Sequence, residues 1–145
     1  MKNTLYIGID PGTHTGVAVW NHTTYRLESV ETMTITQAME KVRWSHNLLD
    51  DDTDIEYEVV VFMEDARKRT WFGNAGRAKL QGAGSIKRDC AIWETFCEEL
   101  GVECRKIAPK NNYTKLTAKQ FKALTNWAGR TSDHSRDAAM LVFGR

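Results

Sequence analysis

Hydrophobic residues gather in short blocks over the first third of the chain, and their spacing predicts strands. Leu5–Asp10 is predicted to be a buried strand that ends before Pro11, because proline cannot donate a hydrogen bond to a strand ladder. A second strand is predicted to start at Gly16–Trp20, and a third over Thr24–Met33. Three strands so closely spaced are typical of an antiparallel meander.

The middle of the chain changes from a helical pattern to a strand pattern. Apolar residues at helical spacing run from Ile35 to Leu49 and follow a capping-box sequence, Thr34–Gln37, which predicts a helix. The acidic run 50–54 is predicted to be a loop. Val59–Met63 is uninterrupted and largely β-branched. Such a run predicts a central strand, buried on both faces, with helices on each side of the sheet.

The second half of the chain is mainly helical. We expect a long helix over Ala78–Leu100, ended by Gly101, then a strand over Val102–Ala108. Two helices follow: Thr117–Asn126, with Phe121 and Leu124 inward, and a last one capped by Ser132 and running through Phe143. The buried stripe of the long helix is predicted to be Leu80, Ala83, Ile86, Cys90, Trp93, Cys97 and Leu100. The pattern predicts a mixed α/β fold around one sheet.

Composition narrows the class of protein. The 145 residues suit one domain, and 41% hydrophobic with 27% charged residues is ordinary for a globular protein. No apolar run approaches the roughly 18 residues of a membrane span. The N-terminal sequence lacks the apolar core of a secretion signal, and three cysteines without a close pair fit a reducing compartment. We therefore expect a cytoplasmic protein that has no contact with a membrane.

Charge is distributed unevenly along the chain. Residues 1–66 contain 4 Lys/Arg and 12 Asp/Glu, a balance of −8, whereas residues 67–145 contain 16 and 7, a balance of +9. Such a skew favours an anionic partner for the second half, with nucleic acid as the leading candidate. A solvated surface with uneven charge is the alternative explanation.

Four residues form the candidate catalytic set. Asp10 and Glu64 each end an apolar strand, and Asp137 lies in the last helix, three residues after His134. Adjacent strands can place the first two side by side, and residues three apart share one helix face. Three carboxylates and an imidazole suit Mg²⁺ or Mn²⁺, and two such ions can hydrolyse a phosphodiester. Asp65 and Asp133 are alternative ligands.

Three segments resemble the RuvC family of Holliday-junction resolvases: GIDPGTHTGVAVW (8–20), VVVFMED (59–65) and HSRDAAMLV (134–142). The resemblance implies a ribonuclease-H-like fold, with a five-stranded mixed sheet of three antiparallel and then two parallel strands, flanked by helices. It implies that Asp10, Glu64, His134 and Asp137 are the catalytic and metal-binding residues. It further implies a Mg²⁺-dependent homodimer, with Mn²⁺ as a substitute, that nicks two like strands of a four-way DNA junction.

Two other functions stay open from the sequence. A ribonuclease H or a YqgF-like nuclease acting on RNA would keep the fold and change the substrate. A non-catalytic protein that binds branched DNA is the third possibility. The clustered acids argue against that third reading, because such charges are costly to keep together without a role.

Basic and aromatic residues after the second catalytic strand are expected to bind DNA. Cations position a duplex through its phosphates, and an aromatic side chain can stack on a base. In the RuvC family an aromatic residue shortly after the glutamate is proposed to insert near the crossover, but Trp71 and Phe72 follow Glu64 by seven and eight residues, later than this resemblance predicts. They either insert at the junction or pack the loop onto the core. The full predicted set is Arg67, Lys68, Arg69, Trp71, Phe72, Arg77, Lys79, Lys87, Lys110, Lys115 and Lys119.

Overall fold

The computed structural model describes the backbone of residues 2–50, 53–68, 77–109 and 115–145. The strands in chain order are β1 (Lys2–Asp10), β2 (His14–Asn21), β3 (Arg26–Thr34), β4 (Leu49–Asp50), β5 (Ile55–Glu64) and β6 (Glu103–Ile107). The helices are α1 (Ile35–His46), the short 3-10 helix η1 (Ala66–Lys68), α2 (Arg77–Leu100), α3 (Ala118–Thr125) and α4 (Asp133–Val142). None of these helices has both the length and the apolar character that a membrane span requires within the described residues.

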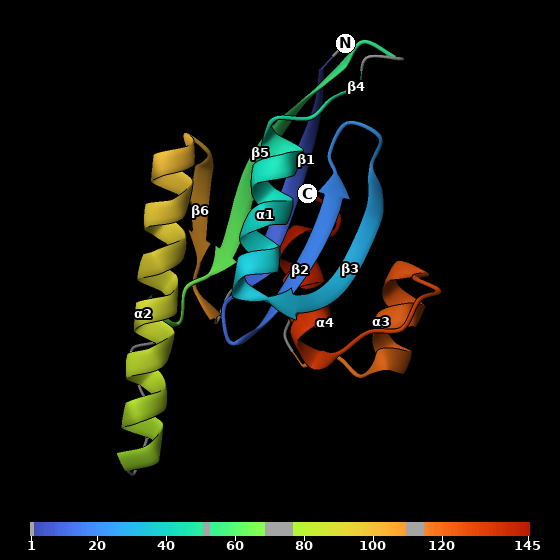
Figure 1. Ribbon diagram of the computed structural model, residues 1–145. Coiled ribbons are helices and arrows are strands. Elements are labelled where there is room, and N and C mark those ends of the chain that lie inside the picture. The colour runs from blue at the N-terminus through green and yellow to red at the C-terminus, as the bar shows by residue number, and fades with distance from the viewer. Residues whose placement is uncertain (1, 51–52, 69–76, 110–114) are drawn as a thin grey trace.

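The strands form one mixed sheet with β1 at its centre (Figure 1). β1 pairs antiparallel with β2, and β2 pairs antiparallel with β3. On its other side β1 pairs with β5 in parallel, and β5 pairs in parallel with β6. The two-residue strand β4 pairs antiparallel with the first residues of β5. The five long strands therefore have the predicted arrangement of three antiparallel and then two parallel strands.

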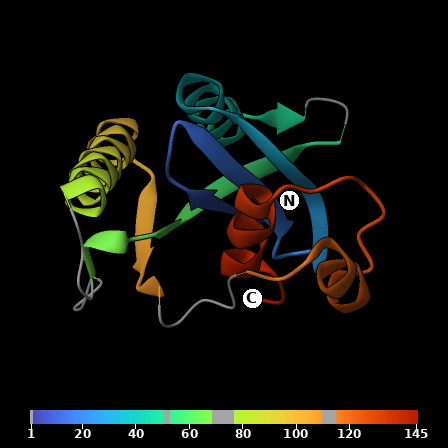
Figure 2. The same cartoon turned by 90° about the horizontal axis from the view of Figure 1, so that it is seen from below.

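Alternation along the strands divides the core into two parts, one on each face of the sheet. Odd-numbered residues of β1 and β5, such as Ile7 and Val61, pack against α1 and α2. Even-numbered residues of β5, Val60 and Phe62, pack with Ala138 and other residues of α4. Figure 2 shows α1 and α2 on one side of the sheet and α4 on the other. The predicted strand buried on both faces is confirmed as β5.

Two glycines let α4 approach the sheet closely. A Cβ at Gly8 would lie 2.1 Å from the carbonyl oxygen of Ala138, and one at Gly16 would lie 1.9 Å from that of His134. Both distances are far below a van der Waals contact, so only residues without a side chain allow this packing. The glycines of the first hairpin thus set where α4 lies.

Several predicted positions were wrong at the ends of elements. Leu49 belongs to β4 and not to the preceding helix, and Asp50, the first residue of the expected acidic loop, also pairs with β5. Ile86 is 39% exposed because the first half of α2 extends beyond the sheet, as Figure 1 shows, and Leu124 is 53% exposed at the end of α3. Cys90, Trp93, Cys97 and Phe121 are buried as predicted. Strand β5 begins earlier than Val59, and β3 begins later than Thr24.

Candidate active site

Two carboxylates end neighbouring parallel strands. Asp10 is the last residue of β1 and Glu64 the last of β5, and each directly follows the paired residues Ile9 and Met63. Because parallel strands run in the same direction, their last residues lie at one edge of the sheet. Both carboxylates occupy even-numbered positions, so they lie on the face that α4 covers. The sheet therefore brings together the two acids that the sequence places 54 positions apart.

Helix α4 adds the imidazole and the third carboxylate. Nδ1 of His134, in the first turn, lies 3.1 Å from Oδ2 of Asp10. Ser132 caps the N-terminus of the helix: its hydroxyl accepts from the backbone N–H of Ser135 and also contacts the hydroxyl of Thr32 on β3. The N-terminus of α4 is thus held against the strand ends, and this places the imidazole of His134 beside the carboxylate of Asp10.

Electrostatics at Asp10 reflect both burial and its neighbours. The pKa of its carboxyl is raised from 3.8 to about 6, mainly by burial and to a smaller extent by the negative charges of Glu64 and Asp137. The contact with His134 acts in the opposite direction. A carboxyl whose pKa is raised by other carboxylates is typical of acids gathered to bind a cation or exchange a proton.

Arg136, which the sequence analysis did not single out, holds the chain segment beside Asp137. Its Nε donates to the carbonyl oxygen of Leu116 at 2.8 Å, and its Nη1 donates to the carbonyl and hydroxyl oxygens of Thr131. This buried guanidinium fixes the turn in which the backbone N–H of Lys115 donates to Oδ1 of Asp137 at 3.1 Å. The only sequence signal was an arginine within the mainly apolar last helix.

A cavity of about 370 Å³ opens beside this turn. It reaches the carboxylate of Asp137 and is bordered by the chain leading into α3. Its lining residues are Lys115, Leu116, Thr117, Ala118, Asp133, Arg136 and Asp137. The third carboxylate of the candidate site is therefore accessible from outside the protein.

The chemistry of these residues fits a hard divalent cation. Carboxylate oxygens with one imidazole nitrogen are donors that Mg²⁺ and Mn²⁺ accept. Within the described residues, however, no group of three or more His, Cys, Asp or Glu side chains stands ready to hold one ion. Asp10 contacts His134, and Asp137 accepts a backbone N–H. The candidate site suits a divalent cation because of its ligand types, carboxylate oxygens and one imidazole nitrogen, and because of its concentrated negative charge. Binding an ion would require these side chains to reorient.

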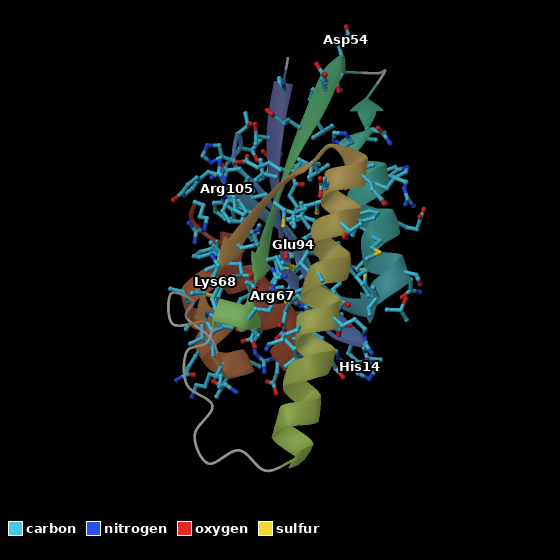
Figure 3. All side chains as sticks on the ribbon, turned by 90° about the vertical axis from the view of Figure 1, so that its left-hand side faces the viewer. His14, Asp54, Arg67, Lys68, Glu94 and Arg105 are labelled. Atoms are coloured by element: carbon cyan, nitrogen blue, oxygen red, sulfur yellow. The ribbon has the colours of Figure 1, made fainter. Side chains whose placement is uncertain are left out.

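The two alternative ligands are engaged elsewhere. Both carboxylate oxygens of buried Asp65 accept from the Arg67 guanidinium at 2.8 Å, and this pairing lowers the pKa of Asp65. Asp133 pairs with Arg136. Arg67 also pairs with Glu94 of α2, which in turn accepts from Lys106 of β6 at 3.1 Å. Figure 3 shows Arg67 and Lys68 beyond the end of β5, with Glu94 on the helix above.

Removing Arg67 is expected to loosen the chain that follows Glu64. Arg67→Met would leave Asp65 buried without its cation, and breaking such a pair is strongly destabilising. Because the Arg67 side chain is 28% exposed, solvent screens part of the effect, and we expect a loss of about 2 kcal/mol in urea unfolding. Arg88→Met, at a more exposed arginine, should change stability by less than about 0.5 kcal/mol. Equal losses in both variants would contradict this role.

The predicted DNA-binding residues fall into four groups. Lys87, Lys115 and Lys119 are exposed, while Arg67 and Lys68 make contacts within the protein, Lys68 through its Nζ to the carbonyl oxygen of Lys106. Arg77 and Lys79 lie in the first turn of α2, where the side chains are not described. Arg69, Trp71, Phe72 and Lys110 lie outside the described residues. Contact of all these residues with DNA stays a prediction.

Comparison with solved structures defines the fold class. The chain has a ribonuclease-H-like fold: a structure described as T. thermophilus RuvC in complex with Holliday junction substrate matches it with a TM-score of 0.51 and 17% identity, over 95% of this chain and 89% of that chain. A further Thermus thermophilus RuvC structure matches with a TM-score of 0.44 and 17% identity, over 94% and 90%. No family model and no curated protein sequence matches the chain.

Proposed function

We propose that this chain is a Mg²⁺-dependent endonuclease that resolves four-way DNA junctions by paired symmetric nicks. The observation that carries the proposal is the meeting of Asp10 and Glu64, at the ends of parallel strands, with His134 and Asp137 on α4. The fold adds support, because the RuvC structure that it resembles holds a Holliday junction substrate.

Each residue of the set has a distinct part in the proposed reaction. Asp10, Glu64 and Asp137 would hold divalent cations, with Mn²⁺ able to replace Mg²⁺. When bound, two such ions activate water and neutralise the charge on the leaving oxygen. Nδ1 of His134 orients the Asp10 carboxylate, which leaves the other ring nitrogen to exchange a proton with solvent or with the leaving oxygen. The products would be a 5′-phosphate and a 3′-hydroxyl.

Two symmetric nicks require two active sites in one assembly. The chain as described carries one set of the four residues, so the proposal includes a homodimer with twofold symmetry. Such a dimer would place equivalent sites on two strands of like polarity. The basic residues of the second half of the chain would contact the phosphates of the junction arms.

A substrate panel tests the proposal. A synthetic four-way junction, a linear duplex of the same sequence and an RNA/DNA hybrid are incubated with the protein in Mg²⁺, Mn²⁺ or Ca²⁺. We expect paired nicks in the junction with Mg²⁺ and Mn²⁺, ligatable ends, and little cleavage of the duplex. Preferred cleavage of the hybrid would favour the RNA-directed nuclease. Tight junction binding without any product would favour the non-catalytic binder.

A further inference from the structure

A second cavity, of about 460 Å³, lies between α3 and the chain that leads into α4. We call it the Trp127 cavity. Its lining residues are Ala118, Lys119, Phe121, Lys122, Trp127, Gly129, Arg130 and Thr131. The volume falls within the range of about 300–1,000 Å³ that small-ligand sites occupy. It is therefore large enough for one nucleotide.

The charge of this cavity is entirely positive. Lys119 and Lys122 are three residues apart on α3 and so share one face of the helix, and Arg130 adds a third cation from the loop. No carboxylate belongs to the lining, and none of the three cations forms an ion pair within the described part of the chain. Three unneutralised cations around one hollow favour an anionic ligand.

The apolar part of the cavity is formed by an aromatic side chain. The Trp127 ring packs partly against the core, and its indole N–H is buried without a hydrogen-bond partner among the described residues. A Cβ at Gly129 would lie 2.9 Å from this nitrogen, which is closer than van der Waals contact, so the indole packs directly against the glycine. A side chain at position 129 would therefore displace the ring, so the glycine fixes where Trp127 borders the cavity.

The Trp127 cavity lies next to the candidate active site. Ala118 lines both this cavity and the one that reaches Asp137. Arg136 also connects them, because its guanidinium donates hydrogen bonds to Thr131, which lines the Trp127 cavity, and to Leu116, which lines the other. A DNA strand whose phosphate lies at Asp137 could therefore continue into the Trp127 cavity.

We infer that the Trp127 cavity binds an unpaired nucleotide of the DNA strand that enters the active site. Its base stacks on Trp127, and the flanking phosphates pair with Lys119, Lys122 and Arg130. Stacking on an aromatic ring with cations along the backbone is how single strands are bound without sequence preference. This inference rests on the proposed function for the identity of the strand, and binding alone suffices to test it.

Single-strand binding in EDTA tests the inference without cleavage. The affinity of the protein for a fluorescein-labelled oligothymidylate of 12 nucleotides is measured by fluorescence anisotropy over a range of salt concentrations. Lys122→Gln/Arg130→Gln is expected to weaken binding about tenfold and to reduce the salt slope by about 0.7 for each cation removed. The control Lys2→Gln/Arg26→Gln removes the same charge at the opposite end of the sheet and should change affinity less than about twofold.

A second readout follows Trp127 itself. Oligothymidylate should quench part of the wild-type tryptophan fluorescence, and Trp127→Phe should lose that part while keeping most of the affinity, because phenylalanine can still stack. Trp127→Leu, checked for folding by thermal melting, should weaken binding at least fivefold. Unchanged quenching in Trp127→Phe, or equal affinity of the two double variants, would overturn the inference. If the wild-type protein did not cleave the junction in Mg²⁺ but these binding effects were observed, the proposed function would be overturned and the inference about the cavity would stand.

Discussion

Asp10→Asn is expected to reduce cleavage of a four-way junction by about 1,000-fold or more. The loss corresponds to roughly 4 kcal/mol of the barrier, within the several kcal/mol that bound cations supply to phosphodiester hydrolysis. The amide keeps the shape of the side chain but not its charge, so it should bind Mg²⁺ poorly. Initial rates on a labelled junction measure the effect, and junction affinity in Ca²⁺ should stay within about threefold of wild type.

The same substitution is expected to stabilise the protein at neutral pH. The Asp10 side chain is 17% exposed, and the pKa of its carboxyl rises from 3.8 to about 6 on folding. Between these pH values the folded state holds a proton that the unfolded state has lost, so the free energy of unfolding falls as pH rises through this window. Asparagine has no such dependence. Asp10→Asn should therefore gain about 1–3 kcal/mol above pH 6, and the gain should vanish below about pH 4.

Urea unfolding at pH 4 and pH 8 separates these effects from a general loss of folding. Asp54→Asn, at an exposed carboxylate at the opposite end of the sheet (Figure 3), is the matched control and should leave both stability and cleavage nearly unchanged. Mg²⁺ should raise the melting temperature of wild type and of this control more than that of Asp10→Asn. A wild-type cleavage rate in Asp10→Asn would rule out the proposed active site.

Gly16→Ala is expected to have the largest effect of any single methyl group on this fold. Its Cβ would lie 1.9 Å from the carbonyl oxygen of His134 and 3.1 Å from the backbone nitrogen of Ser135. Neither atom belongs to a flexible side chain, so α4 must move away from the sheet. We expect a loss of about 3 kcal/mol or more in urea unfolding.

Displacement of α4 should also separate His134 from Asp10. A shift of about 1 Å in a reacting group can cost roughly 100-fold in rate, so cleavage should fall by at least that factor even where the variant stays folded. Gly12→Ala is the matched control, because its Cβ would meet its nearest atom, the carbonyl oxygen of His14, at an ordinary 3.5 Å. If Gly16→Ala were as stable and as active as Gly12→Ala, α4 could not lie where the structure places it.

Local patterns predicted most of the elements because their causes are local. The capping box at Thr34 starts α1, and Ser132 caps α4 as expected. The apolar run Val59–Met63 lies in a strand covered by helices on both faces. Strand ends were also accessible to sequence reasoning: an acid directly after an apolar run is recognisable at both Asp10 and Glu64.

Other features escaped the sequence because they depend on distant partners. Ile86 is exposed because the sheet ends before it reaches this part of α2. Leu49 lies in a strand only because β5 offers an edge for pairing. The role of Gly16 requires the position of His134, which lies 118 residues later. The sequence could not show that Arg136 holds the turn at Lys115, since two of its acceptors, at Leu116 and Thr131, are backbone carbonyls, which have no sequence signature.

By itself, the order of apolar and polar residues determined the α/β class and the central strand, and it singled out four residues as candidates to act on a phosphodiester. Hydrophobic periodicity and capping depend on residues only a few positions apart, so they can be recognised in the sequence alone. Only the tertiary structure decided that α4 packs over Gly8 and Gly16. The parallel strands of the sheet were expected from the family resemblance and not from the local pattern, and the structure shows β1 and β5 as parallel neighbours. Pairing and close packing depend on contacts between residues far apart in the chain, and short-range patterns carry no information on them.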